Sequence, residues 1–202
     1  MEVDPPEVMH MKNVIYFLIL SVALVSETAA QNLTDSGPNG SGPAVAGAKV
    51  VARKAADTVS FPYDGGRVRF LVNKDETAAR FSLLEIIEPV GYKTPLHRHS
   101  DIDEAFYVIE GTLTAKIGEQ DTQEFGPGSF VLIPRGTVHA QGNFGKAPVK
   151  LLITALPGGF EQFFADRVKL LKELKPGEAG FDERLKTVIE NNHIEVLGPW
   201  VP

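Results

Sequence analysis

Four side chains near the middle of the chain have the types and spacing of metal ligands: His97, His99, Glu104 and His139. In an extended strand, residues i and i+2 point to the same face, so the two imidazoles at positions 97 and 99 project side by side. Glu104 follows a polar bend and begins the next apolar run, so a hairpin can return its carboxylate to the histidines. His139 would reach them from a later strand.

Three neutral imidazoles and one carboxylate form a mixed nitrogen and oxygen ligand set. Such a set suits Fe, Mn, Ni, Co, Cu or Zn, and the ligand types do not choose among these metals. Four protein ligands leave up to two positions on a six-coordinate ion, which could accept an oxygen-donor substrate, dioxygen or both. The sequence has no cysteine, which excludes a thiolate nucleophile, an iron–sulfur site and a disulfide framework.

Other polar residues near these four are expected to have surface or supporting roles. Arg98 lies between two of the histidines in sequence and should face the opposite side of the strand. Asp101 and Asp103 are expected in a solvated bend, and His193 on the surface. Asn143 is expected in a turn or beside a ligand, without binding the metal itself.

Short apolar runs broken by turn residues predict an all-β domain over residues 58–157. The spacing suits an antiparallel sandwich or barrel and leaves no room for helical crossovers between parallel strands. Gly111 and Gly136 stand where the chain must turn or bulge. Residues facing the interior are expected to include some of Phe81, Leu83, Tyr107 and Phe130. The predicted strands are 68–72, 81–87, 105–110, 113–117, 130–134 and 149–156.

After Pro157 the apolar spacing changes to that of helices, which we assign with the tail to a segment of residues 158–202. Residues 160–174 place apolar side chains on one helical face, and residues 181–192 predict a second, shorter helix. Both are expected to pack on the β domain. The Phe160, Phe163 and Phe164 cluster is expected to belong to the core.

The first thirty residues resemble a signal peptide. Residues 14–25 form an uncharged apolar run that is short for a membrane span, and cleavage before Gln31 would remove it. Met11 is a better start than Met1, because the positive charge then precedes the apolar run. A polar linker rich in Gly, Ser and Pro follows over residues 31–57, with glycosylation sequons at Asn32 and Asn39.

The composition is that of an ordinary globular protein, with 43% hydrophobic and 23% charged residues. A net charge of −6 without a basic patch argues against nucleic acid as a partner. We therefore expect a secreted, extracellular or periplasmic protein that binds a small molecule, without stable membrane insertion after cleavage. A homodimer is compatible with these features.

The ligand residues stand within two motifs that resemble those of the cupin superfamily. The first reads G-x5-H-x-H-x4-E-x6-G and the second G-x5-P-x-G-x2-H-x3-N, with no departure at any specified position. The matching residues are Gly91, His97, His99, Glu104 and Gly111, then Gly128, Pro134, Gly136, His139 and Asn143.

This resemblance implies a single conical cupin (jelly-roll) β-barrel with the metal inside, bound by His97, His99, Glu104 and His139. Cupins that have lost their metal usually have a ligand replaced, and none is replaced here. The Pro157–Glu161 junction resembles the quercetin 2,3-dioxygenase-like group. That group would bind a flavonol-like enol oxygen at the metal, and Glu104 would bind the metal or take up the substrate proton as the catalytic residue.

Other functions fit the same ligand set. A decarboxylase or isomerase could use the metal as a Lewis acid. A non-catalytic secreted binding protein of the auxin-binding type is also similar, although the chain lacks the ER-retention tail of that group. Germin-like proteins share the ligands but carry an N-terminal cysteine pair that this sequence lacks.

Overall fold

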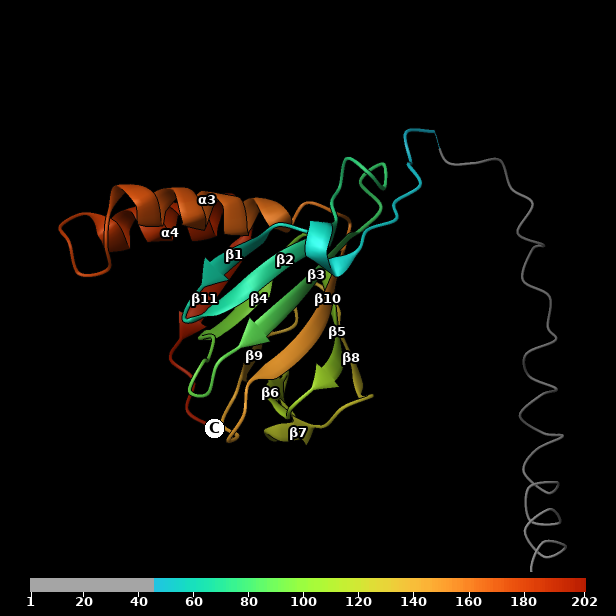
Figure 1. Cartoon of the computed structure of the whole chain (residues 1–202). Coiled ribbons are helices and arrows are strands. Elements are labelled where there is room, and N and C mark those ends of the chain that lie inside the picture. Colours follow the sequence, from blue (N-terminus) through green and yellow to red (C-terminus); the bar gives the residue numbers. More distant parts are fainter. Residues whose placement is uncertain (1–45) are drawn as a thin grey trace, which may run out of the picture. The chain divides into compact units, whose positions relative to one another are not determined.

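The computed structural model describes residues 46–202 of the chain (Figure 1). The predicted signal peptide, its cleavage site and the two sequons lie outside the described residues. Within the range assigned to the linker, residues 46–57 contact the β domain: the Lys49 amide donates to the Glu76 carbonyl at 2.8 Å. Arg53 forms an ion pair with the Glu76 side chain. No helix in residues 46–202 is long and apolar enough to cross a membrane.

Within residues 46–202, eleven strands form two antiparallel sheets, which confirms the prediction of a mainly β fold (Figure 1). The six-stranded sheet has the order β1-β2-β3-β10-β5-β8, and the five-stranded sheet has the order β11-β4-β9-β6-β7. Closure of the two sheets into one conical barrel stays a prediction. The strands are β1 (Ser60–Tyr63), β2 (Gly66–Val72), β3 (Ser82–Glu88), β4 (Leu96–His99), β5 (Asp103–Glu110), β6 (Leu113–Ile117), β7 (Gln123–Phe125), β8 (Phe130–Ile133), β9 (His139–Gly142), β10 (Val149–Leu156) and β11 (Ile194–Gly198).

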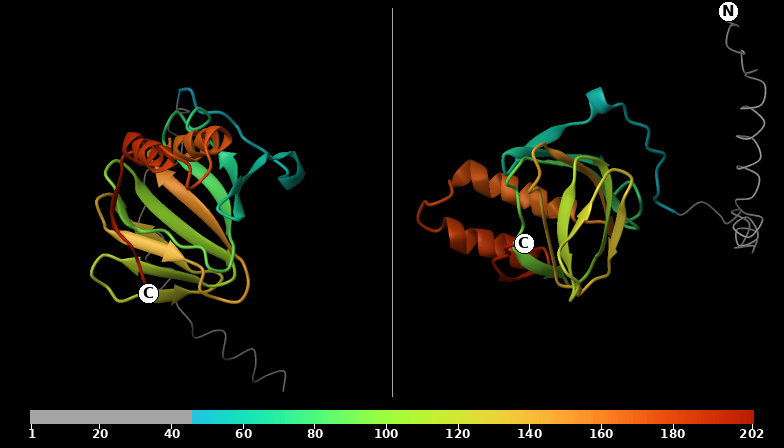
Figure 2. Two further views of the ribbon diagram at one scale, coloured as in Figure 1. Left: turned by 90° about the vertical axis from the view of Figure 1, so that its left-hand side faces the viewer. Right: turned by 90° about the horizontal axis from the view of Figure 1, so that it is seen from below.

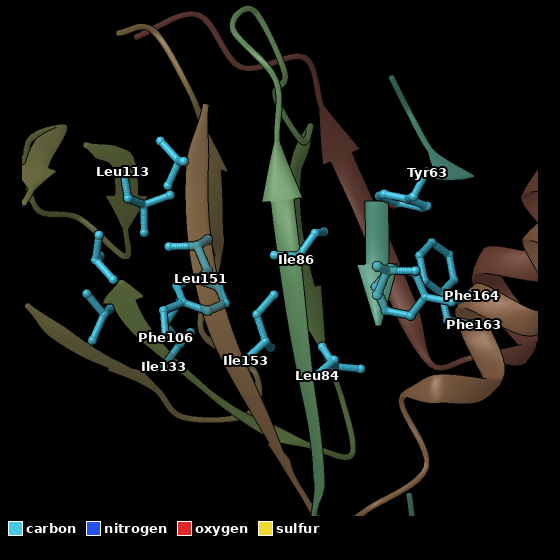
Figure 3. Close-up of a cluster of buried hydrophobic side chains, with 14 of the residues drawn as sticks. Tyr63, Leu84, Ile86, Phe106, Leu113, Ile133, Leu151, Ile153, Phe163 and Phe164 are labelled. Carbon is cyan, nitrogen blue, oxygen red and sulfur yellow. The ribbon is translucent and has the colours of Figure 1, made fainter. Parts of the chain in front are cut away.

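The core lies between the two sheets and takes side chains from both (Figure 3). Strand β3 alternates strictly, with Leu84 and Ile86 buried and the residues between them half-buried. Phe106 from β5 and Leu113 from β6 are fully buried in the same cluster. Burying one such side chain stabilises the fold by roughly 1.5–3 kcal/mol, so this alternation fixes the register of the strands.

The prediction of which aromatic residues face inward was wrong by one residue. Tyr107 is 45% exposed and Phe130 is 63% exposed, whereas Phe106 and Val131 are buried. Phe81 and Leu83 are half-buried beside the buried residues of β3. The reason is the period of two in a strand: because Glu104 faces the interior, Phe106 must do so too, and Tyr107 must face outward.

Two predicted turn positions show why glycine stands there. Gly111 and Gly136 both have φ of +79°, a left-handed conformation that side chains rarely adopt. A Cβ on Gly111 would also lie 2.6 Å from the Pro148 carbonyl oxygen. Asn143 is fully buried in a turn, where its Nδ2 donates to the carbonyls of Glu88 and Ala147. Its predicted turn role is confirmed.

Two helices follow strand β10 in the chain, as predicted. They are α3 (Glu161–Glu173) and α4 (Phe181–Asn191), which pack side by side beyond one end of the sheets (Figures 1 and 2). Phe163 and Phe164 at the start of α3 enter the core, and Phe164 meets Tyr63 edge to face at 4.9 Å between ring centroids (Figure 3).

The chain ends in a strand that the sequence pattern did not indicate. After α4, strand β11 returns to the five-stranded sheet and pairs with β4, with Ile194 opposite His99 and Val196 opposite His97. Strands β1 and β7 were not predicted either. All three are short, and their apolar residues are too few to show a clear period of two.

Candidate metal centre

The four predicted ligands come from three strands in the two sheets. His97 and His99 lie on β4 and His139 on β9, where His97 and His139 are direct cross-strand partners. Glu104 reaches the group from β5 in the opposite sheet. One ligand atom from each of the four residues lies within 4.8 Å of the others. The structure therefore brings together all four residues that the spacing singled out.

Backbone carbonyls orient two of the imidazoles. The Nδ1 of His97 lies 2.9 Å from the Pro95 oxygen, and the Nδ1 of His139 lies 2.9 Å from the Thr137 oxygen. A carbonyl can only accept, so each Nδ1 carries the proton and Nε2 is left as the metal-binding atom. Such a second hydrogen bond fixes the tautomer and ring orientation of histidine ligands.

His99 supplies a direct test of whether a cation fits. Its side chain is 3% exposed, and neither ring nitrogen has a hydrogen-bond partner within residues 46–202. Its Nε2 lies 3.5 Å from Oε2 of Glu104, and His139 Nε2 lies 3.2 Å from the same oxygen. A buried polar atom without a partner is costly, and a metal ion between these atoms would satisfy Nε2 of His99 together with the Glu104 carboxylate. The residues present thus fit a divalent cation.

The charge states also suit a cation. Burial would raise the pKa of Glu104, but the hydrogen bond to His139 and the charges of His99 and His139 outweigh it and hold the pKa below its usual range. Burial, helped by the neighbouring His139 and His99, lowers the pKa of His97 to about 4. The pKa of His139 is raised, because Glu104 outweighs the opposing effect of burial. At neutral pH the carboxylate is therefore ionised and His97 is neutral.

Polar residues next to the ligands form surface pairs that connect the ligand strands to neighbouring segments. Arg98 faces away from the centre, as predicted, and pairs with Glu195 of β11 at 2.7 Å. Asp103 does not lie in a solvated bend: it begins β5 and accepts hydrogen bonds from the backbone and side chain of Arg135 at 2.9 and 3.0 Å. The side-chain hydrogen bond from Arg135 leads the effects that lower the pKa of Asp103 to about 2. This pair joins the Glu104 strand to the turn before His139.

The centre opens into a cavity of about 290 Å³. His97, His99 and Glu104 line it together with an aromatic wall, so the phenylalanine cluster of α3 is both core and cavity lining. Phe160 lies edge to face with the His99 ring at 5.1 Å between centroids. Sequence patterns missed several further lining residues, because these reach the cavity only through the tertiary fold. The aromatic residues are Tyr63, Tyr92, Phe160, Phe163 and Phe164, and the lining residues that were missed include Tyr63, Tyr92, Gln141 and Arg167.

A second carboxylate lies behind the cavity wall. Glu88 is fully buried, and its Oε1 accepts a hydrogen bond from Nε2 of Gln141 at 2.9 Å. Its Oε2 has no partner in the described part of the chain. Burial, with a smaller contribution from the charge of Glu104, raises the pKa of Glu88 to about 7 against the opposing hydrogen bond from Gln141.

This burial predicts a pH-dependent stability. The pKa of Glu88 is about 7 in the folded protein, against an ordinary value of 4.5 for the unfolded chain. The neutral, buried Glu88 therefore contributes its full share to the free energy of unfolding below pH 4.5. This contribution is lost as the pH rises through 7. The shift corresponds to about 3 kcal/mol. We expect Glu88→Gln to raise the melting temperature relative to the wild type more at pH 8 than at pH 5.

Thermal unfolding of the metal-free protein across this pH range measures the effect. Glu124→Gln, on an exposed part of β7, is the control and should keep the wild-type pH profile. A melting-temperature difference between Glu88→Gln and the wild type that stays constant from pH 5 to pH 8 would show that Glu88 titrates normally.

The Pro157–Glu161 junction joins the last strand of the six-stranded sheet to α3. Glu161 accepts a hydrogen bond from the Lys74 amide at 2.8 Å and another from the Ser82 hydroxyl. A Cβ on Gly158 would lie 2.8 Å from the Phe81 backbone. Both residues therefore serve the docking of α3, and only Phe160 of this junction lines the cavity.

Comparison with known proteins places these features in a family. Residues 83–155 match the model of the cupin domain. An uncharacterized protein of Methanocaldococcus jannaschii is 34% identical over 95 residues, which are 46% of this chain and 75% of that protein. Germin-like protein subfamily T member 3 of Arabidopsis thaliana is 37% identical over 70 residues, which span 33% of this chain and only 30% of the germin-like protein.

Two solved structures resemble about half of this chain, with TM-scores below 0.5. KdgF from Halomonas sp. has a TM-score of 0.47 at 14% identity, over 52% of this chain and 92% of that one. The polyketide cyclase RemF from Streptomyces resistomycificus has a TM-score of 0.46 at 26% identity, over 53% and 79% of the two chains. The domain match shows that residues 83–155, which lie within the two-sheet fold, form a cupin domain.

Proposed function

We propose that the chain is a metal-dependent dioxygenase that acts on a small phenolic or enolic compound. The observation that carries the proposal is the placement of the three-histidine, one-glutamate centre at the wall of an aromatic-lined cavity. A flat ring can lie against the aromatic side chains while its hydroxyl group points to the centre.

His97, His99, Glu104 and His139 would hold the metal. When bound, the ion would act as a Lewis acid that favours the deprotonated form of a phenol or enol and could also accept dioxygen. The protein supplies the base: Glu104 is held ionised, so one of its carboxylate oxygens can take up the proton that the substrate loses. Phe160 and its neighbours exclude water from this proton transfer.

Oxygen uptake tests the proposal directly. The protein is loaded separately with Fe, Mn, Ni, Co, Cu or Zn and mixed with a panel of flavonols and catechols. Oxygen consumption with at least one pair of metal and substrate is expected. Binding of these compounds without any oxygen uptake would favour a non-catalytic binding protein. Release of CO₂ from a carboxylic acid without net oxygen uptake would favour a decarboxylase.

A further inference from the structure

Arg167 brings a positive charge into the same cavity from helix α3. Its guanidinium lies over the Tyr63 ring, 5.1 Å from the ring centroid, and both residues line the cavity together with His97 and Glu104. Stacking on an aromatic face holds a guanidinium in one plane. Arg167 thus places a fixed positive charge in the cavity that His97, His99 and Glu104 of the metal centre also line.

Part of the hydrogen-bonding capacity of this guanidinium is unused. Its Nη2 donates to Oδ1 of Asp64 at 2.6 Å, while its Nε is buried and has no partner among residues 46–202. A guanidinium carries five N–H donors, and its planar fork matches a carboxylate in two parallel hydrogen bonds.

The surroundings make a carboxylate the best match. The lining between Arg167 and the metal centre is aromatic, with Tyr63, Phe163 and Phe164 on the side of the helix. Lys93, which also lines the cavity, adds positive charge. A matching ligand would carry an oxygen donor at the end that meets the metal centre and an anionic group at the end that meets Arg167. A flat apolar body would lie between them, against the aromatic side chains.

We propose that Arg167 binds the carboxylate of the ligand, so that the substrate class is a small aromatic or enolic carboxylic acid whose hydroxyl end reaches the metal centre. Only the position of the hydroxyl end at the metal centre rests on the proposed function; the contact between Arg167 and the carboxylate does not. Asp64 then acts as the internal competitor that neutralises Arg167 until a ligand carboxylate replaces it.

Binding of two matched probes tests the assignment. Zn-loaded protein, which supports no redox turnover, is titrated calorimetrically without oxygen against catechol and 3,4-dihydroxybenzoate. The wild type should bind the dihydroxybenzoate at least about tenfold more tightly, as expected for a charged hydrogen bond. Arg167→Gln should abolish this preference and leave the affinity for catechol within about twofold. Arg184→Gln, in an ion pair with Glu173 on the helix surface, is the control and should keep the preference.

Asp64→Asn separates ligand binding from a purely structural role. Asp64 has φ of +46°, which asparagine tolerates, so the turn should keep its shape. Removal of the competing carboxylate should tighten binding of the dihydroxybenzoate. If Arg167 merely fixes α3 to the turn, both variants would weaken the two probes equally, and the assignment would be overturned.

Two other outcomes also contradict the inference: no binding of either probe, and a preference for the carboxylate that survives in Arg167→Gln, because the carboxylate would then lie at the metal. Failure of the proposed function is distinct from these. An Arg167-dependent preference without oxygen uptake by any metal form would keep the inference and refute the dioxygenase.

Discussion

Wild-type protein purified without chelator is expected to carry about one first-row divalent ion per chain, and the His97→Ala/His139→Ala double variant is expected to lose it. The two side chains are cross-strand partners, and their Nδ1 atoms are already fixed by backbone carbonyls. Their removal leaves one imidazole and one carboxylate, too few to hold such an ion against water. Elemental analysis by mass spectrometry gives the metal content.

His193→Ala serves as the matched control, because His193 lies in the turn before β11 and is not one of the four clustered ligands. This variant should keep full occupancy. Circular dichroism would show whether the double variant is still folded. A folded double variant with wild-type metal content would rule out the centre as the binding site.

Glu104→Gln is expected to lower turnover per bound metal by about 100-fold or more, the range for loss of a general base. The amide has almost the same shape as the carboxylate, but it cannot accept the substrate proton. It also removes the charge that His99 and His139 face at 3.5 and 3.2 Å, so weaker metal binding accompanies the loss. Rates must therefore be divided by the metal content of each sample.

Glu110→Gln on the same strand is the control for this variant. Glu110 pairs with Lys150 on the surface, away from the centre, and its replacement should leave turnover unchanged. A Glu104→Gln enzyme within a few-fold of wild-type turnover, at equal metal content, would assign the proton transfer to another group.

Local spacing predicted that His97 and His99 act together, and the resemblance to the two cupin motifs added Glu104 and His139 to the ligand set. His97 and His99 share a face through the period of a strand, and the turn glycines fix where the chain reverses. The same reasoning could have placed Phe106 inward and Tyr107 outward, since Glu104 already sets the phase of β5. The prediction was wrong because the alternation of inward and outward residues along β5 was not counted from Glu104.

The remainder of the cavity could not be read from local patterns. Tyr63 and Arg167 are more than 100 positions apart, yet the cation lies over the ring. Gln141 stands on a strand of only four residues, all of them buried, which shows no alternation to interpret. Such residues meet through the docking of α3 on the sheets, which the helical pattern predicted only in outline.

The pairing of β11 with β4 has a consequence for when the centre can form. His97 and Val196 are direct partners although about a hundred residues of chain separate them, so the strand with two ligands gains this neighbour only from β11, which follows both helices in the sequence. Until that segment leaves the ribosome, β4 lacks the partner that holds its edge. We therefore expect a nascent chain that has not yet formed β11 to retain metal poorly, so that metal loading follows the synthesis of both helices.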